Sequence, residues 1–551
     1  MNNSRFSLLY PLMLGVAIAI GVFIGYFLPG NNGSRPGFAG LKTGKRDKVQ
    51  NVIDYIVNEY VDTLNTKDLE DDAIVSLLQQ LDPHSAYIPA EELEGASEQL
   101  EGNFDGIGVE FNIQKDTIMV VAAITGGPSE SLGIQSGDRI VKIEKNIVAG
   151  KKIKNEDVIK QLRGKSGTKV KVSIFRPGQK ALKDYTITRG KIPIYSIDAS
   201  LMINPEIGYI KISRFAATTY DEYLEAFKAL KEQGMQQLVV DLRDNPGGYL
   251  NAAVDISDEF LGKGKGIVHT KGKARKAEEF NASSKGSFEE GGLVILIDEG
   301  SASASEIVSG AVQDNDRGWV VGRRSFGKGL VQEEVRFDDG SAMRLTIARY
   351  YTPSGRCIQK PYEKGVEEYY KELSDRMQHG ELENADSVKF GDSLAFKTTA
   401  GRTVYGGGGI MPDVFVGLDT SGYSSWLSQL AGKSLLNRFA FEYTDQRRKE
   451  LLNSYKTPAD FSRSFSVSST FAQFLAFAEK NGVKTDPAGL KASENLVKKQ
   501  VNALIGRALY GSKGYYTIVN NSDPAIKKAV ELLKSNKLVS ASQTRQPAAK
   551  L

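Results

Sequence analysis

Short apolar runs and segments of helical periodicity alternate through the middle of the chain. Residues 293–297 are all apolar and largely β-branched, which predicts a strand buried on both faces. A turn of small residues follows, and the next apolar residues recur at helical spacing: Ile307, Val308, Ala311 and Val312. Further strands are predicted at 207–212, 238–242 and 342–351, and helices at 220–233 and 252–261. This alternation predicts a largely parallel α/β core beyond residue 192.

The regions that flank this core have other patterns. Residues 45–80 carry apolar faces at helical spacing, which predicts two helices. Short β-like segments separated by glycine turns occupy residues 101–191, and amphipathic helical sets fill residues 421–538. The highly charged residues 363–392 predict a surface insertion. We therefore divide the chain into residues 1–30, 31–44, 45–100, 101–191, 192–420, 421–538 and 539–551, the last of which is predicted to be disordered.

Residues 8–28 contain no charged side chain over 21 positions. A helix of that length can cross a bilayer, so the pattern predicts a transmembrane helix. No small-residue cleavage site follows, which favours an uncleaved signal anchor over a removed signal peptide. Charge leaves the orientation open, because Arg35, Lys42, Lys45 and Arg46 place more positive charge after the segment than Arg5 places before it.

Composition narrows the chemistry without identifying it. The 551 residues are 40% hydrophobic and 25% charged, with a net charge of +4, and no basic stripe argues for nucleic-acid binding. Cys357 is the single cysteine, which excludes an internal disulfide and a cysteine-rich metal site. The chain has three histidines, His84, His269 and His379, so a Ser-His-Asp arrangement is poorly supplied.

The turn after residues 293–297 contains candidate nucleophiles. Ser301, Ser303 and Ser305 lie where a strand passes into a helix, and the pattern does not select among them. The free N–H groups and the positive dipole end of a helix N-terminus favour a developing oxyanion. Lys328 is the candidate base, because it lies between two glycines with apolar neighbours, and full burial can lower the pKa of a lysine by about 3–5 units.

These residues resemble the active-site segment of the carboxyl-terminal processing proteases, also called tail-specific proteases, a Ser-Lys serine peptidase family. The turn Ser-Ala-Ser-Ala-Ser-Glu at 301–306 is followed by Phe-Gly-Lys-Gly-Leu-Val-Gln at 326–332. The resemblance implies that Ser303 is the nucleophile, that Lys328, 25 positions later, is the general base, and that Gln332 orients the lysine. Gly329 and Val331 disfavour helix, so the sequence itself favours a strand between Lys328 and Gln332. Residues four apart lie about 13 Å apart along a strand but are neighbours in a helical turn, so we expect the active form to bend into a turn that brings these two side chains together.

The resemblance extends over about residues 45–413. It implies a multidomain α/β protein whose peptidase core is of the crotonase/ClpP-like type, between an N-terminal transmembrane helix and a helical C-terminal extension. The loop Arg-Asp-Asn-Pro-Gly-Gly at 243–248 would supply an oxyanion-hole N–H from Gly247 or Gly248, with Ala304 as the second donor. His84 lies in a phrase shared with the family and is expected to be structural.

Residues 101–191 resemble a PDZ domain, in which Gly106, Ile107, Gly108 and Val109 would form the carboxylate-binding loop. Consecutive N–H groups in a glycine turn can hold a chain-terminal carboxylate, and the strand that follows can pair with an extended peptide. The resemblance therefore implies that the domain captures exposed C-terminal segments of substrate proteins.

The implied function is a serine endopeptidase that cleaves extracytoplasmic proteins at or near their C-terminal region. It would be anchored in the inner membrane by one helix, with its catalytic domains in the periplasm, and would need no metal, cofactor or nucleic acid. Whether the protein forms a homo-oligomer or needs an activating adaptor stays open.

Two other functions are considered. One alternative is a non-catalytic PDZ scaffold tethered to the membrane, against which the intact Ser-Lys-Gln set argues. Another is a Ser-Lys amidase of the cell envelope, against which the PDZ-like region argues.

Overall fold

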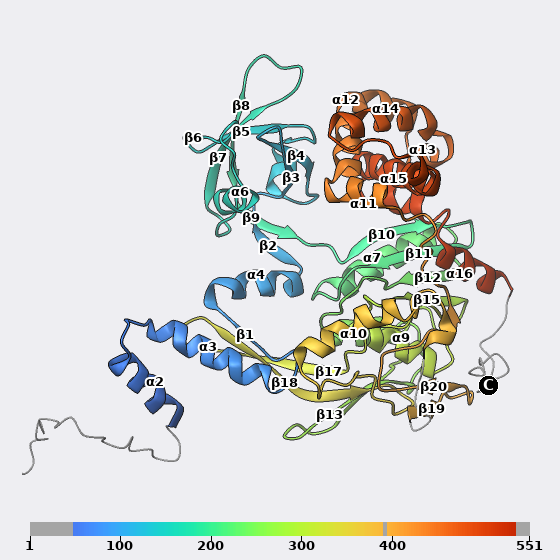
Figure 1. Cartoon of the computed structure of the whole chain (residues 1–551). Helices are drawn as coiled ribbons and strands as arrows, with labels where there is room; N and C mark the ends of the chain where they lie inside the picture. The colour runs from blue at the N-terminus through green and yellow to red at the C-terminus, as the bar shows by residue number, and fades with distance from the viewer. Residues whose placement is uncertain (1–47, 389–393, 536–551) are drawn as a thin grey trace, which may run out of the picture. The chain divides into compact units, whose positions relative to one another are not determined.

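The computed structural model describes residues 48–388 and 394–535 (Figure 1). The predicted transmembrane segment 8–28 and the tail 539–551 lie outside the described residues. Within those ranges no helix combines the length and the apolar character that crossing a membrane requires. The chain divides into two compact units, Met1–Ala73 and Ile74–Leu551.

The first unit contains α2 (Lys48–Glu59) and the first half of α3 (Thr66–Gln79). Both predicted helices of residues 45–80 are therefore confirmed. On α2 the buried residue is Ile53, whereas Val49, Val52 and Tyr55 are exposed.

The core of the second unit is a six-stranded sheet in the order β10-β11-β12-β15-β16-β21. Neighbouring strands are parallel except β10 and β11. The strands are β10 (Ile197–Met202), β11 (Ile207–Ile212), β12 (Gln237–Asp241), β15 (Leu293–Ile297), β16 (Trp319–Gly322) and β21 (Val414–Phe415). Three helices follow its strands: α7 (Thr219–Glu232) after β11, α8 (Leu250–Asp258) after β12 and α9 (Ala304–Asp314) after β15. The predicted alternation of strands and helices is confirmed.

Successive strand residues face two different apolar cores, as the period of two in a strand requires. Leu238 and Val240 of β12 pack into a core shared with α7, α8 and α9. Val239, between them, packs into a core that contains Ala525 and Ile526 of α16 (Pro524–Lys534). The sheet thus lies between helices on both faces, and the helix that covers the second face comes from the C-terminal region.

A second sheet carries the segment after Lys328. Its order is β1-β18-β13-β14, with β17 also paired to β18, and its pairs are antiparallel. The strands are β1 (Ala86–Ile88), β13 (Gly266–Gly272), β14 (Glu278–Asn281), β17 (Leu330–Arg336) and β18 (Ala342–Tyr351). The strands β19 (Ala395–Lys397) and β20 (Thr403–Tyr405) form a separate antiparallel pair.

An inserted β-region follows α4 (Ala90–Glu101). The antiparallel pair β2 (Asn103–Gly106) and β9 (Gly190–Pro193) opens and closes it. Between them lies a sheet in the order β3-β4-β5-β7-β8, with β6 beside β5. Its elements are β3 (Val109–Gln114), β4 (Thr117–Ala123), α5 (Pro128–Ser131), β5 (Arg139–Ile143), β6 (Asn146–Ile147), α6 (Asn155–Leu162), β7 (Lys169–Phe175) and β8 (Lys183–Thr188). The region has its own apolar core, so it can hold its shape around the edge strand β3.

The C-terminal region is helical, as predicted. It contains α11 (Ser425–Gly432), α12 (Leu435–Ser454), α13 (Pro458–Ser464), α14 (Val467–Lys480), α15 (Pro487–Val519) and α16. Helix α15 is interrupted at Gly511, whose φ of 67° is left-handed. The helices α11 to α15 share an aromatic-rich core of their own, separate from the core under α16.

Candidate active site

Ser303 lies in a strained turn between β15 and α9. Its φ of 55° and ψ of −113° are unfavourable for a residue with a Cβ atom. The Ser303 N–H donates to Glu306 Oε2 at 2.8 Å, and the preceding Ala302 N–H donates to the Asn245 carbonyl oxygen at 3.0 Å. The surrounding hydrogen bonds therefore hold a conformation that the residue alone would avoid, at the N-terminus of a helix.

The three serines of this turn have different surroundings. Ser301 and Ser305 are fully buried, and their hydroxyls donate to the carbonyl oxygens of Leu242 and Asn245, at 2.8 and 2.9 Å. Ser303 is only half-buried, and its hydroxyl donates to no residue that the structure describes. Ser303 is thus the one whose hydroxyl stays available for chemistry, a distinction that the sequence pattern did not supply.

Glu306 connects the serine turn to the lysine loop. Its buried carboxylate accepts from the N–H groups of Ser303, Gly327 and Lys328 at 2.8, 2.8 and 2.9 Å, and from the Ser325 hydroxyl at 2.5 Å. Burial raises the pKa of Glu306 to about 7, although these hydrogen bonds act to lower it. The Ser-x-x-Glu spacing of residues 303–306 is typical of a helix capping box, which could have indicated the contact with the Ser303 N–H. The sequence had no signal for the three donors of residues 325–328.

A second contact joins the same two residues. The buried Tyr350 hydroxyl, on β18, lies 3.0 Å from the Ser303 carbonyl oxygen and 2.5 Å from the Lys328 carbonyl oxygen. Ser303 and Lys328, 25 positions apart, therefore share two buried partners, Glu306 and Tyr350. The structure brings the backbones of the predicted nucleophile and the predicted base together.

Lys328 is the predicted base. Its ammonium makes no hydrogen bond or ion pair with any residue in the described ranges. Burial lowers the pKa of Lys328, and the positive charge of Arg344 lowers it further, whereas Glu306 and Asp82 oppose the shift. A partly buried lysine without a partner is more easily neutral than an exposed one, which is the state that can remove a proton.

Gln332 does not meet Lys328 in this structure. The segment is extended, because β17 begins at Leu330 and pairs with β18, with a bulge between Val331 and Gln332. The turn expected for the active form stays a prediction. The Gln332 amide donates to the Thr346 hydroxyl at 3.3 Å, and that hydroxyl donates to Asp82 Oδ1 at 3.0 Å. The pairing with β18 keeps the segment extended, in agreement with the strand preference that Gly329 and Val331 indicate.

The predicted oxyanion loop touches the serine turn directly. A Cβ added at Gly247 would lie 2.7 Å from Ser303 Cβ and 2.9 Å from the Ala304 nitrogen. The Gly247 N–H donates to Asn245 Oδ1 at 2.9 Å, whereas the N–H groups of Gly248 and Ala304 have no partner among the described residues. Of the two glycines that the sequence left open, Gly248 is therefore the one whose N–H remains available among the described residues, as does the N–H of Ala304.

A segment before β1 lines the lysine site. Asp82 Oδ1 accepts from the N–H groups of His84 and Ser85 at 2.8 and 2.9 Å. His84 Nε2 lies 2.8 Å from the Tyr369 hydroxyl, and burial lowers the pKa of His84 to about 4, with the Lys328 charge contributing. His84 is therefore neutral and held in place, which agrees with the expected structural role.

Residues 363–392 are more than a surface insertion. Their helix α10 (Val366–Gln378) buries Tyr369 and Arg376. Arg376 Nη1 donates to the Ser325 carbonyl oxygen at 2.8 Å, next to the loop that holds Lys328. The interpretation as a surface insertion was wrong for this face of the helix, because a high content of charge does not show which charged residues are paired inside.

The predicted carboxylate-binding residues lie between β2 and β3. Ile107 is buried, and its carbonyl oxygen accepts from the Ser129 hydroxyl at 2.6 Å. Gly108 has a φ of 73°, and a Cβ there would lie 3.2 Å from the Gly127 Cα atom, so the turn needs glycine. Val109 opens β3, an edge strand of its sheet. The loop thus leads into a strand whose outer edge no described strand pairs.

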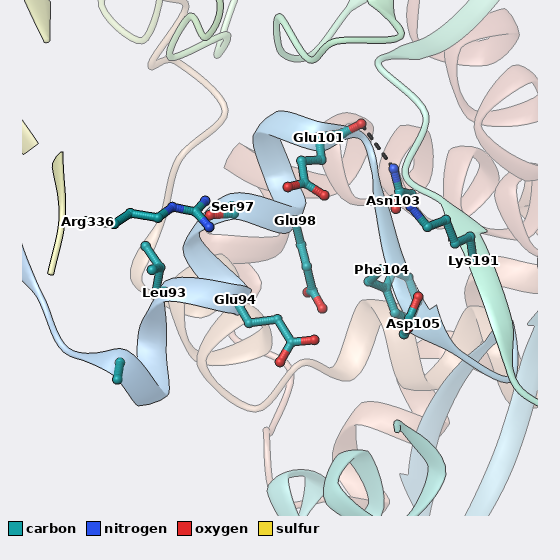
Figure 2. A pocket seen from close by; sticks show the side chains of 11 residues that line it. Leu93, Glu94, Ser97, Glu98, Glu101, Asn103, Phe104, Asp105, Lys191 and Arg336 are labelled. Atoms are coloured by element: carbon teal, nitrogen blue, oxygen red, sulfur yellow. Dashed lines mark hydrogen bonds between the residues drawn. The ribbon is translucent and has the colours of Figure 1, made fainter. Parts of the chain in front are cut away.

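A polar cavity of about 410 Å³ lies elsewhere, against α4 (Figure 2). Its charged lining residues are Glu94, Glu98, Glu101, Asp105, Lys191 and Arg336. Glu98 is already paired with Arg163 at 2.7 Å, and none of the predicted catalytic or oxyanion residues lines the cavity. In the described ranges, no three His, Cys, Asp or Glu side chains converge as a metal site requires.

Comparison with known proteins places this chain in a family. Residues 206–371 match Peptidase family S41, and residues 426–511 match a family of unknown function. The chain is 33% identical to carboxy-terminal processing protease CtpA of Bacillus subtilis over 371 residues, 67% of this chain and 78% of that protein. It is 35% identical to the carboxy-terminal-processing protease of Bartonella bacilliformis over 313 residues, 56% of this chain and 71% of that protein.

Solved structures include the photosystem II D1 C-terminal processing protease, at 28% identity over 56% of this chain and 89% of that one, with a TM-score of 0.32. Another is the PDZ domain of a carboxy-terminal protease from Vibrio cholerae in complex with peptide, at 27% identity over 16% of this chain and 97% of that one, with a TM-score of 0.15. Both TM-scores are low, so the assignment depends on the sequence relatives. The family match and the relatives define a serine-type peptidase. The chain belongs to the carboxy-terminal processing proteases of peptidase family S41.

Proposed function

We propose that this peptidase works through a dyad of Ser303 and Lys328. The observation that carries the proposal is the shared pair of buried partners, Glu306 and Tyr350, which hold the two backbones together. Around them, the Ser303 hydroxyl donates to no described residue, and the Lys328 ammonium has no partner there. Acyl transfer requires a nucleophile and a base whose backbones are held in place and whose reactive groups are not engaged in other hydrogen bonds.

The chemistry follows from these positions. Neutral Lys328 accepts the proton of the Ser303 hydroxyl as Oγ attacks the carbonyl carbon of the substrate. The N–H groups of Gly248 and Ala304 stabilise the oxyanion, aided by the N-terminus of α9. Lys328 then gives its proton to the leaving amine, and an acyl-enzyme forms on Ser303. Water that loses its proton to Lys328 hydrolyses the ester and restores the serine.

In this proposal, Gln332 orients Lys328 only after a change of conformation. In the extended β17 its amide bonds Thr346, so it would orient Lys328 only after the segment between them bends. Substrate binding would have to supply that change.

Substrate capture is assigned to the inserted β-region. The unpaired edge of β3 can add an extended peptide as a further strand, and the loop of residues 106–109 can hold its terminal carboxylate. The proposed substrates are therefore proteins with exposed C-terminal segments. A membrane anchor at residues 8–28 completes the proposal and is supported by the 21 positions without a charged side chain. The family resemblance, rather than the charge pattern, supports catalytic domains outside the cytoplasm.

The test is cleavage of a protein with a free C-terminal tail by purified variants. Ser303→Ala and Lys328→Ala should each abolish cleavage with the fold intact, as checked by circular dichroism. Lys364→Ala, at an exposed lysine, is the matched control and should keep wild-type activity. Turnover near the wild-type rate by either of the first two variants would refute the dyad.

A further inference from the structure

We propose that Asp523, in the C-terminal region, is a positioning residue for the oxyanion loop and acts through Arg243. The proposal rests on the function proposed above, since it assigns a support to the same site. Asp523 lies outside both matched segments, 206–371 and 426–511.

Arg243 is the first residue of the loop that ends at Gly248, and it is fixed at three points. Its backbone N–H and its guanidinium both bond Asp241, the last residue of β12, at distances of 2.6 to 3.0 Å. Its carbonyl oxygen accepts from the Lys211 ammonium. The guanidinium Nη1 donates to Asp523 Oδ2 at 2.9 Å. Asp523 is therefore the outer contact of a buried polar cluster that begins the loop.

The rest of the loop depends on this start. Two residues later, Asn245 accepts from the Ala302 N–H and the Ser305 hydroxyl, and its side chain accepts from the Gly247 N–H. A displacement of Arg243 would therefore reach both the oxyanion donors and the turn that holds Ser303. Shifts well below 1 Å matter there, because an oxyanion hole depends on fixed donor positions.

Asp523 has two roles that a substitution can separate. Its Oδ1 atom caps α16 by accepting from the N–H groups of Ala525 and Ile526 at 2.8 and 3.1 Å, whereas Oδ2 faces Arg243. Asparagine and serine are equally good caps but carry no charge. Asp523→Asn and Asp523→Ser should therefore keep α16 on the sheet and remove only the ion pair.

The chain offers a matched control. Asp486 also caps a helix, α15: its Oδ1 accepts from the Ala488 N–H at 3.3 Å and its Oδ2 from the Gly489 N–H at 2.8 Å, and it has no ion pair within the described residues. Asp486→Asn thus makes the same chemical change in the same region without touching Arg243. A general loss of stability in the helical region would affect both variants alike.

The experiment measures kcat, KM and the affinity of a peptide aldehyde, whose adduct with a serine nucleophile places an oxygen in the oxyanion hole. Outright loss of an oxyanion donor costs about 10²–10³ in kcat, so displacement of the loop by Asp523→Asn should lower kcat about tenfold. Aldehyde affinity should fall by a similar factor, with KM unchanged. Asp486→Asn should leave all three values as in the wild type.

Hydrogen exchange of the peptide that covers residues 243–249 gives a readout that needs no activity. We expect faster exchange there in Asp523→Asn and Asp523→Ser than in Asp486→Asn. Unchanged exchange and a kcat within twofold of the wild type would overturn the role of Asp523. If Ser303→Ala kept its activity, the proposed dyad would fail. The exchange data would still decide whether Asp523 holds the loop.

Discussion

At the scale of single residues, the site depends on the hydrogen bonds that the Glu306 carboxylate accepts. One carboxylate receives backbone N–H groups from the serine turn and from the lysine loop. Local motifs in the sequence pointed to Ser301, Ser303 and Ser305 as candidate nucleophiles and to Lys328 as the candidate base, and the family resemblance selected Ser303 among the serines. The sequence could not show that Glu306 and Tyr350 join these segments, because their partners are distant in the chain and only the fold brings them together.

The pH dependence of activity tests Lys328 as the base. Burial and Arg344 lower its pKa below the ordinary 10.5. In the proposed mechanism the neutral form of Lys328 is the active one. We expect kcat/KM to rise with pH and to level off above that lowered pKa. A profile measured with a peptide substrate from mildly acid to alkaline pH checks this. A flat profile over a range in which the protein stays folded would contradict the role.

The stability of Glu306→Gln tests the environment of the carboxylate. Its pKa is about 7 in the folded protein and 4.5 ordinarily, so the folded state holds the proton more tightly between these values. The contribution of Glu306 to stability is therefore full below pH 4.5 and is lost as the pH rises through 7. The free energy of unfolding of the wild type, relative to Glu306→Gln, should fall over this range by about 1.4 kcal/mol per unit of pKa shift. Denaturant titrations at several pH values measure it, and a difference that grows with pH would contradict the assignment.

At the scale of elements, prediction worked where the cause is local. The strand, turn and helix around Ser303 follow from an apolar run, small residues and helical spacing, and all three are present. The segment from Lys328 to Gln332 is extended, as Gly329 and Val331 favour, and pairing with β18 fixes it. The turn expected for the active form stays a prediction. The inner face of α10 was missed because its buried Arg376 meets a carbonyl oxygen about 50 positions away.

The packing of the oxyanion loop on the serine turn predicts a specific effect of Gly247→Ala. Gly247 and Gly264 both have left-handed φ values, 98° and 80°, so alanine strains the backbone at either site. Only at Gly247 would the new Cβ meet Ser303 and Ala304, whereas at Gly264 nothing lies within 4 Å. We expect Gly247→Ala to lose at least about 10²-fold in kcat, the scale of a lost oxyanion donor, and Gly264→Ala to keep near-wild-type kcat. Equal activity in the two variants would show that the loop does not serve the reaction.

At the scale of the whole molecule, the C-terminal region is part of the peptidase core as well as an addition to it. Helix α16 covers one face of the central sheet, with Ala525, Ile526, Ala529 and Leu533 in the same apolar cluster as β11, β12 and β15. The amphipathic pattern of residues 421–538 predicted helices. It could not show that one of these helices covers a face of the sheet whose first strand begins at Ile197. That contact joins residues about 300 positions apart.

Removal of α16 should therefore damage the core. A chain that ends at Ser522 would expose the apolar sheet face and lose the Asp523 contact to Arg243, so we expect aggregation or a clearly lowered melting temperature. A chain that ends at Ser535 keeps α16 and is the control. Size-exclusion chromatography and thermal unfolding compare the two. Equal stability would mean that α16 does not hold the sheet.

The central claim is that Ser303 carries the acyl group during cleavage. Acid quenching of a reaction with a peptide substrate, followed by digestion and mass spectrometry, would locate a trapped intermediate. We predict that the N-terminal product fragment is found as an ester on Ser303, and that Lys328→Ala accumulates none. An adduct on another residue, or turnover that persists in Ser303→Ala, would contradict the account.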